Sequence, residues 1–260
     1  MTDPLTSGTP LVIAAHGTRD EAGVAECRAL AERVARKLPG IPVELGFVEL
    51  AEPGIPEAVG AAVAQAPDNP EGAGGDEEAA AVVVPLMFNT GGHVREDIPE
   101  AIDEGRGDAR VMYSAPLLPD VRMRKALNHR LTETLAAGEG CEEWRPRDTS
   151  AVLVGRGALV PDANASHYTL TRMFWEENDL SRVEPAFIQV TRPSVPEALS
   201  ALAAQGANQI VVQGNFLFPG LLHVWMTEQV EAWQASHPGV EIRTVSYTHL
   251  RAHETSLHLV

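Results

Sequence analysis

The same succession of segments occurs twice along this chain of 260 residues, and this internal repeat limits the possible folds more than any other feature. Three segments of the first half have a counterpart in the second half, in the same order. The pairs are residues 12–17 with 151–157, residues 47–58 with 187–198, and residues 82–92 with 210–220. A repeat of this kind predicts two homologous structural units. We therefore expect two lobes that face one another across a cleft.

Within each half, short apolar runs alternate with segments that have apolar residues at helical spacing. In the first half we expect strands at residues 11–15, 43–50, 80–88 and 109–114. We expect helices at residues 21–38, 55–66, 98–104 and 121–137. Strands that alternate with helices form parallel sheets covered by helices on both faces. The predicted fold class is therefore α/β, with lobes at residues 10–137 and 151–245, each containing a mostly parallel sheet, and a polar connector at residues 138–150.

Two histidines of the first half follow apolar runs at the points where the expected strands end. His16 comes directly after residues 11–15, and His93 follows residues 82–88 after a pair of glycines. Glu49 lies near the end of the expected strand between them. Open α/β sheets bind ligands beyond the carboxyl ends of their strands. Two imidazoles and a carboxylate at that edge predict a metal ion or proton-transfer chemistry.

The second half carries different residues at the corresponding positions. It has Arg156 for His16, Gln189 for Glu49 and, in ungapped alignment, Leu221 for His93. His223 lies two positions beyond Leu221, so a shift of register would bring it nearer to the crevice. The repeat therefore predicts one lobe that carries the active site and a second lobe that supports it.

The net charge of −16 at pH 7 argues against nucleic acid as a partner, because phosphate binding requires a basic surface. No apolar run reaches the ~18–20 residues of a membrane span, and residues 1–10 lack a signal-peptide pattern. We therefore expect a cytoplasmic protein without a membrane partner. The two cysteines, Cys27 and Cys141, form no CxxC pair and are expected to be unreactive thiols rather than a disulfide.

Three segments of the first half share residues with a known family of enzymes. They are Ala-His-Gly-Thr-Arg at residues 15–19, Gly-Phe-Val-Glu at residues 46–49 with Pro53, and residues 85–99, in which glycine, histidine, an acid and proline follow a buried strand. This pattern resembles the class II chelatases, which insert a divalent metal into sirohydrochlorin in cobalamin and siroheme biosynthesis. The resemblance extends over residues 10–245.

The resemblance implies roles for the residues that match it. His16 and His93 would be the metal-binding, catalytic pair, and Glu49 an additional ligand or an acid–base group. The implied enzyme is a lyase that acts without ATP or an organic cofactor, and the chain has no Walker signature. Its substrates would be a tetrapyrrole, sirohydrochlorin, and a divalent metal, either Co²⁺ or Fe²⁺, with Ni²⁺ as a further option.

The residue types suit metal insertion on chemical grounds as well. Neutral imidazole binds Co²⁺, Fe²⁺ and Ni²⁺ and accepts protons near neutral pH. Two histidines and one carboxylate leave coordination positions open, as a site that transfers its ion to ring nitrogens requires. This ligand set does not separate cobalt from iron.

The carboxylates of a tetrapyrrole would be repelled by an acidic protein unless the surface that binds them is locally basic. Four arginines near expected strand ends are candidates for binding these carboxylates: Arg19, Arg95, Arg156 and Arg192. Arg156 is of most interest, because it occupies the repeat position of His16.

Other functions fit parts of the sequence. A non-catalytic carrier of metal or tetrapyrrole would share the scaffold but bind one equivalent without turnover. A two-lobed solute-binding protein is disfavoured by the lack of an export signal. Phosphohistidine chemistry of the phosphoglycerate mutase type is disfavoured by Ala15, where that family has arginine.

The sequence leaves the oligomeric state open. A monomer is compatible with the two-lobed chain, because shorter relatives would need two copies to build the same cleft. His129, His167 and His237 have no partner pattern and are expected at the surface.

The last fifteen residues, 246–260, contain His249, His253 and His258 but match neither the repeat nor the family. They resemble translated sequencing-adapter read-through, so we interpret them as a non-native tail and not as a metal-binding segment. On this interpretation, the final strand and a helix of the second lobe would be truncated.

Overall fold

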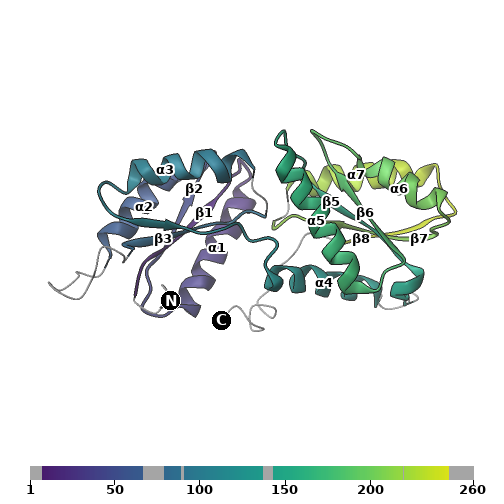
Figure 1. The fold of residues 1–260 in the computed structure, drawn as a ribbon, viewed down its shortest axis with the longest axis horizontal. Coiled ribbons are helices and arrows are strands. Elements are labelled where there is room, and N and C mark those ends of the chain that lie inside the picture. The colour runs from purple at the N-terminus through teal and green to yellow at the C-terminus, as the bar shows by residue number, and fades with distance from the viewer. Residues whose placement is uncertain (1–7, 67–78, 89–90, 137–142, 219, 246–260) are drawn as a thin grey trace. The chain divides into compact units, whose positions relative to one another are not determined.

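The computed structural model describes residues 8–66, 79–88, 91–136, 143–218 and 220–245. The chain forms two compact units, and the division falls between Leu117 and Leu118 (Figure 1). No helix in these described ranges has the length and apolarity needed to cross a membrane.

The first unit contains a parallel four-stranded sheet in the order β2-β1-β3-β4. Its strands are β1 (Leu11–Ala15), β2 (Val43–Phe47), β3 (Ala81–Pro85) and β4 (Val111–Tyr113). Its helices are α1 (Glu21–Lys37), α2 (Ile55–Ala64), the π-helical turn η2 (His93–Asp97) and α3 (Ile98–Gly105). The four strands and the first three helices expected in the first half are therefore present, and η2 is an additional turn that the sequence pattern did not predict.

Alternate residues of β1 pack on opposite faces of this sheet, as the period of two in a strand requires. Val12 and Ala14 belong to the apolar cluster formed with α2 and α3. Leu11 and Ile13 pack on the other side, in the cluster that includes Ala31 of α1. Because both faces are covered, β1 is buried along its whole length and is apolar throughout.

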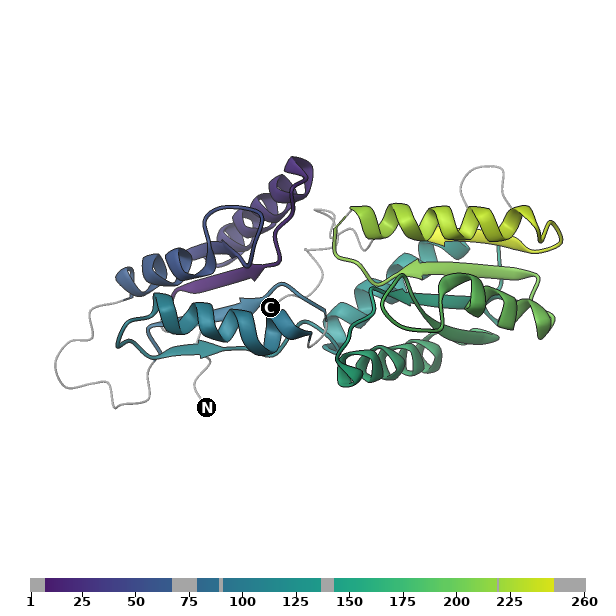
Figure 2. The same ribbon diagram turned by 90° about the horizontal axis from the view of Figure 1, so that it is seen from above.

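The second unit has the same architecture, with the strand order β6-β5-β7-β8. Its strands are β5 (Ser150–Gly155), β6 (Arg182–Phe187), β7 (Gln209–Gly214) and β8 (Glu241–Val245). Its helices are α4 (Val121–Leu135), α5 (Pro161–Asn178), α6 (Val195–Ala204) and α7 (Leu221–Ala235). Helices α6 and α7 cover one face of the sheet, and α5 and α4 cover the other (Figures 1 and 2).

Helix α4 lies in a different unit from the one we expected. The sequence repeat places it within residues 10–137, but its contacts are with β7, β8 and α5 of the second unit. The Gln213 side chain donates a hydrogen bond to the Leu127 carbonyl (2.9 Å), and Arg243 donates one to the Thr134 carbonyl (3.0 Å). The second packing unit therefore begins before α4, whereas the second copy of the sequence repeat begins after it.

The second sheet has four strands like the first, because strand β8 pairs with β7 from Glu241 to Val245. The expected truncation beyond Val245 stays a prediction. Residues 246–260 lie outside the described residues, as does Cys141. The other cysteine, Cys27, is buried in α1, where burial, with a contribution from Glu26, raises its pKa to about 11. This agrees with an unreactive thiol.

Backbone hydrogen bonds confirm the repeat at atomic detail. The Glu49 amide donates to the His16 carbonyl (3.1 Å), and the Gln189 amide donates to the Arg156 carbonyl (3.2 Å). These equivalent bonds match His16 with Arg156 and Glu49 with Gln189, as the sequence predicts.

The third position of the repeat requires a correction of one residue. The Leu86 amide bonds to the Ala14 carbonyl, and the Asn215 amide bonds to the equivalent Val154 carbonyl, both at 2.7 Å. The offset of residue numbers between Leu86 and Asn215 makes Leu222, and not Leu221 or His223, the repeat equivalent of His93. Leu222 is partly buried against the core of the second unit.

His167 is not at the surface, contrary to expectation. It lies on α5 with 1% exposure, and its Nε2 atom is 3.0 Å from the Leu153 carbonyl, to which it donates. The imidazole fits beneath Gly155, where a Cβ atom would be 3.1 Å from its ring. His129 is exposed as expected, while His237 is partly buried and stacks on Trp233. Burial lowers the pKa of His167 to about 4.

We predict that this histidine makes the folded state sensitive to acid. Because its folded-state pKa lies below the ordinary value of 6.5, the unfolded chain binds more protons between these two values. The contribution is complete above pH 6.5 and is lost as the pH falls toward 4. Between pH 7.5 and 5.0, the free energy of unfolding should fall by roughly 2 kcal/mol more in the parent than in His167→Gln.

Urea unfolding at the two pH values measures this difference. His129→Gln, at an exposed histidine, is the control and should show the parental pH dependence. Equal pH dependence in the parent and His167→Gln would contradict the prediction.

Candidate metal centre

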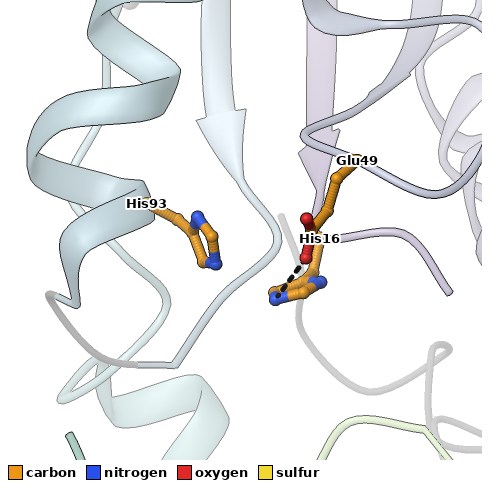
Figure 3. Close-up of side chains that lie close together, drawn as sticks. All are labelled: His16, Glu49 and His93. Atoms are coloured by element: carbon orange, nitrogen blue, oxygen red, sulfur yellow. Dashed lines mark ion pairs between the residues drawn. The ribbon is translucent and has the colours of Figure 1, made fainter.

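His16, Glu49 and His93 lie together beyond the carboxyl ends of the strands of the first sheet (Figure 3). One potential ligand atom of each residue lies within 4.8 Å of those of the other two. The imidazole centroids of His16 and His93 are 4.6 Å apart, with the rings nearly perpendicular at 87°. The Nε2 atom of His16 is 3.8 Å from Oε1 of Glu49. The structure therefore brings together the three residues that the sequence singled out.

The backbone beyond β1 fixes two members of this group. Gly17 follows His16 with φ at +89°, a conformation that favours glycine. A Cβ atom at Gly17 would lie 1.8 Å from the Glu49 carbonyl oxygen, so the two loops approach as closely as backbone allows. His16 and Glu49 are thereby placed next to each other by main-chain contacts, independent of their side chains.

The third member, His93, is the first residue of η2. The amides of Val94 and Arg95 both donate to the Gly91 carbonyl, and the Tyr113 hydroxyl of β4 donates to the Val94 carbonyl at 2.9 Å. Burial raises the pKa of Tyr113 to about 12, so its hydroxyl stays a hydrogen-bond donor at neutral pH. These bonds attach the start of η2 to the preceding loop and to the edge of the sheet.

Each imidazole has its Nδ1 atom engaged by the protein. Nδ1 of His16 is 3.1 Å from the Gly17 carbonyl, which can only accept, so Nδ1 carries the proton in this bond. Nδ1 of His93 is bonded to the carboxylate of Asp97, four residues along η2. The Nε2 atom of each ring is then the one suited to bind a metal ion.

The site is open to solvent. The side chains of His16, Glu49 and His93 are 35%, 49% and 31% exposed. Two nitrogen donors and one oxygen donor suit a borderline divalent ion, and three ligands leave coordination positions for other groups. The arrangement can therefore hold an ion such as Co²⁺ or Fe²⁺ and release it to a second set of donors.

The four arginines are divided between the units. Arg95 lies within η2, and Arg19 lies in the loop after β1; both are exposed. Arg156 follows β5 in the second unit and is exposed, at the position equivalent to His16. Arg192 is exposed but forms an ion pair with Glu197.

Two residues near the site were not found from the sequence as site residues. Asp97 could have been recognised, because a carboxylate four residues after a histidine shares its helix face. Tyr113 gives no comparable signal, since its hydroxyl contact depends on the pairing of β4 with β3.

Residues 10–134 and 150–256 match the CbiX family model. The chain belongs to the CbiX family. The match covers both halves of the repeat and confirms the expected membership in the class II chelatases. It extends to residue 256, so the expectation that residues 246–260 do not match the family is wrong for most of that segment.

Curated relatives of this CbiX protein include enzymes for both metals. A sirohydrochlorin cobaltochelatase of Priestia megaterium is 30% identical over 210 residues, which make up 80% of this chain and 64% of that protein. A sirohydrochlorin ferrochelatase of Bacillus subtilis is 28% identical over 229 residues, 86% of this chain and 80% of that protein. The chain thus spans just under two thirds of the length of the cobaltochelatase.

Solved structures of relatives have the same fold. SirB from Bacillus subtilis with Fe³⁺ aligns with a TM-score of 0.77 at 25% identity, covering 95% of this chain and 91% of that one. The two-unit α/β architecture expected from the repeat is therefore confirmed.

We predict that Gly17 is required for both stability and the metal centre. Gly17→Ala places a Cβ atom against the Glu49 carbonyl, so the loop that carries Glu49 must move. The variant should be destabilised by about 1–3 kcal/mol more than Gly40→Ala, where φ is +88° but nothing lies within 4 Å of the added atom.

Gly157→Ala separates the two effects. It crowds the Gln189 carbonyl in the second unit at 2.1 Å, so it should lower stability but leave Co²⁺ binding unchanged. Urea unfolding and Co²⁺ titration measure both properties. Equal stability of Gly17→Ala and Gly40→Ala would contradict the role assigned to this close approach.

Proposed function

We propose that this protein inserts Co²⁺ or Fe²⁺ into sirohydrochlorin, with His16, Glu49 and His93 as the metal site. The observation that carries the proposal is the convergence of these three side chains, with potential ligand atoms within 4.8 Å of one another, in a member of the CbiX family. Relatives named as cobaltochelatase and ferrochelatase support the tetrapyrrole substrate. The donor set suits both metals, so it does not choose between them.

In the proposed reaction, the ion is first bound by Nε2 of His16, Nε2 of His93 and the Glu49 carboxylate. Insertion exchanges one M²⁺ for two pyrrole protons, so charge is conserved and no electron is transferred. As the ion moves to the ring nitrogens, each imidazole regains a free lone pair at Nε2. That lone pair accepts a pyrrole proton, since imidazole gains and loses protons near neutral pH.

The second unit is proposed to bind the tetrapyrrole periphery. The loops and the helix start beyond its strands expose large apolar side chains: Leu159 at 91%, Leu221 at 67% and Val190 at 54%. Arg156 is exposed at the same edge, after β5. A planar, largely apolar ring with carboxylates at its rim matches an apolar surface with a guanidinium beside it.

The other three arginines have different proposed roles. Arg192 is proposed to contribute less to carboxylate binding, and Arg19 and Arg95 are proposed to bind carboxylates from the first unit. Arg192 is partly neutralised by its ion pair with Glu197. Arg19 and Arg95 lie on the loop and turn that carry the metal site, where they would meet carboxylates near the reacting centre.

An anaerobic insertion assay tests the proposed activity. The parent, followed by absorbance with Co²⁺ or Fe²⁺ and sirohydrochlorin, should complete many turnovers, and the ratio of the two rates ranks the metals. His16→Ala combined with His93→Ala should lower the rate by at least about 100-fold, because both the metal ligands and the proton acceptors are removed. His129→Ala combined with His237→Ala is the matched control and should keep the parental rate.

The assay also separates an enzyme from a carrier. A carrier would take up one equivalent of metal or tetrapyrrole and stop, which would overturn the proposed catalysis. Insertion that is indifferent to both site histidines would overturn the proposed site.

We also propose that the protein acts as a monomer, since a single chain carries both units. Sedimentation at micromolar concentration should give a mass near 27.9 kDa. A mass of twice that value would contradict this.

A further inference from the structure

We propose that Asp97 is a positioning residue for His93, which it holds in the tautomer and orientation that present Nε2 to the metal ion. This inference rests on the proposed role of His93 as a ligand. The carboxylate of Asp97 is bonded to Nδ1 of His93 and is not itself among the grouped potential ligands. Figure 3 shows the other nitrogen of His93 directed toward His16.

The bond fixes which nitrogen carries the proton. An ionised carboxylate only accepts hydrogen bonds, so Nδ1 of His93 must be the donor. Nε2 is then unprotonated and has its lone pair available. His16 reaches the same state through the Gly17 carbonyl, but His93 depends on a side chain for it. Such partners commonly change metal affinity by 10- to 100-fold when they are removed.

The local backbone holds donor and acceptor in place. His93 and Asp97 are the first and last residues of the π-helical turn η2, and the Ile98 amide closes the turn on the His93 carbonyl. The Tyr113 hydroxyl supports the turn from β4. π-Helical turns inside helices are frequent at functional sites.

The second unit carries no such pair at the start of α7. Leu222 matches His93, but α7 lacks the extra residue of the π-helical turn, so the buried Met226 matches the buried Ile98 and Trp225 matches Asp97. Both replacements are apolar. In the first unit, Asp97 is 49% exposed, and its only ion pair in the described part of the chain is with His93. Fold stability therefore gives little reason for a carboxylate at this position.

Two variants of the full chain test the proposal. Asp97→Ala removes the acceptor, and Asp97→Glu keeps a carboxylate that can reach Nδ1 from the same position. Glu133→Gln is the matched control, because His129 and Glu133 form another histidine–carboxylate pair four residues apart on a helix, at 3.5 Å.

The first measurement is the tautomer of the neutral His93 imidazole in the metal-free protein, read from the ¹⁵N chemical shifts of its ring. The parent should show protonated Nδ1 and free Nε2. Asp97→Ala should shift the population toward protonated Nε2, and Asp97→Glu should restore the parental pattern. A parental tautomer in Asp97→Ala would overturn the proposal, and no metal is needed for this result.

The second measurement is Co²⁺ affinity, followed by the visible spectrum of the bound ion. Asp97→Ala should bind Co²⁺ about 10- to 100-fold more weakly than the parent, with an unchanged urea midpoint, while Glu133→Gln binds like the parent. Parental affinity in Asp97→Ala would overturn the proposal.

The two proposals can fail separately. If Asp97→Ala changes both tautomer and affinity but the parent inserts no metal, the chelatase function fails and the positioning role stands. If insertion occurs and is unaffected by Asp97→Ala, the positioning role fails and the function stands.

Discussion

The close approach of two backbone loops at Gly17 is the constraint on which the first unit's site depends. A carbonyl oxygen that occupies the place of a side chain can be accommodated only by glycine, and only with φ in the left-handed region. This contact places the residue before Gly17 and the residue that carries the carbonyl, His16 and Glu49, side by side. The functional groups are thus paired by the main chain before any metal binds.

The same contact occurs at Gly157 and Gln189 in the second unit, where Arg156 and Gln189 occupy the positions of His16 and Glu49. The close contact between glycine and carbonyl is therefore a property of the fold, whereas the ability to bind a metal depends on the side chains of the neighbouring residues. Every ligand of the proposed metal site comes from the first unit. Consequently, Arg156, Gln189 and Leu222 can occupy the equivalent positions without weakening the proposed metal binding, and Arg156 places an exposed guanidinium where the proposal needs one for a carboxylate of the substrate.

Much of this arrangement could be predicted from the sequence because it depends on local patterns. A run of buried apolar residues predicts β1 to the residue, and the end of a strand predicts where His16 and Glu49 lie.

The expectations that failed involve contacts between distant segments. Helix α4 is an amphipathic helix in either unit, and contacts with residues far along the chain, such as Gln213 and Arg243, show which sheet it covers. His167 was misplaced because a polar residue can be buried wherever a glycine such as Gly155 leaves room for its ring. The register of His93 differs by one residue because strand pairing, and not the ungapped sequence, sets the equivalence.

The proposed reaction places opposite demands on the site, and the position of Glu49 meets both. An ion must be bound strongly enough to be captured, yet it must leave for the ring nitrogens. A carboxylate 3.8 Å from Nε2 of His16 adds negative charge that favours binding of the cation. After the ion has left and Nε2 has accepted a proton, the same carboxylate faces an imidazolium instead. The electrostatic attraction lost with the metal is then partly regained from the proton, so release of the ion and uptake of the proton are coupled at one pair of side chains.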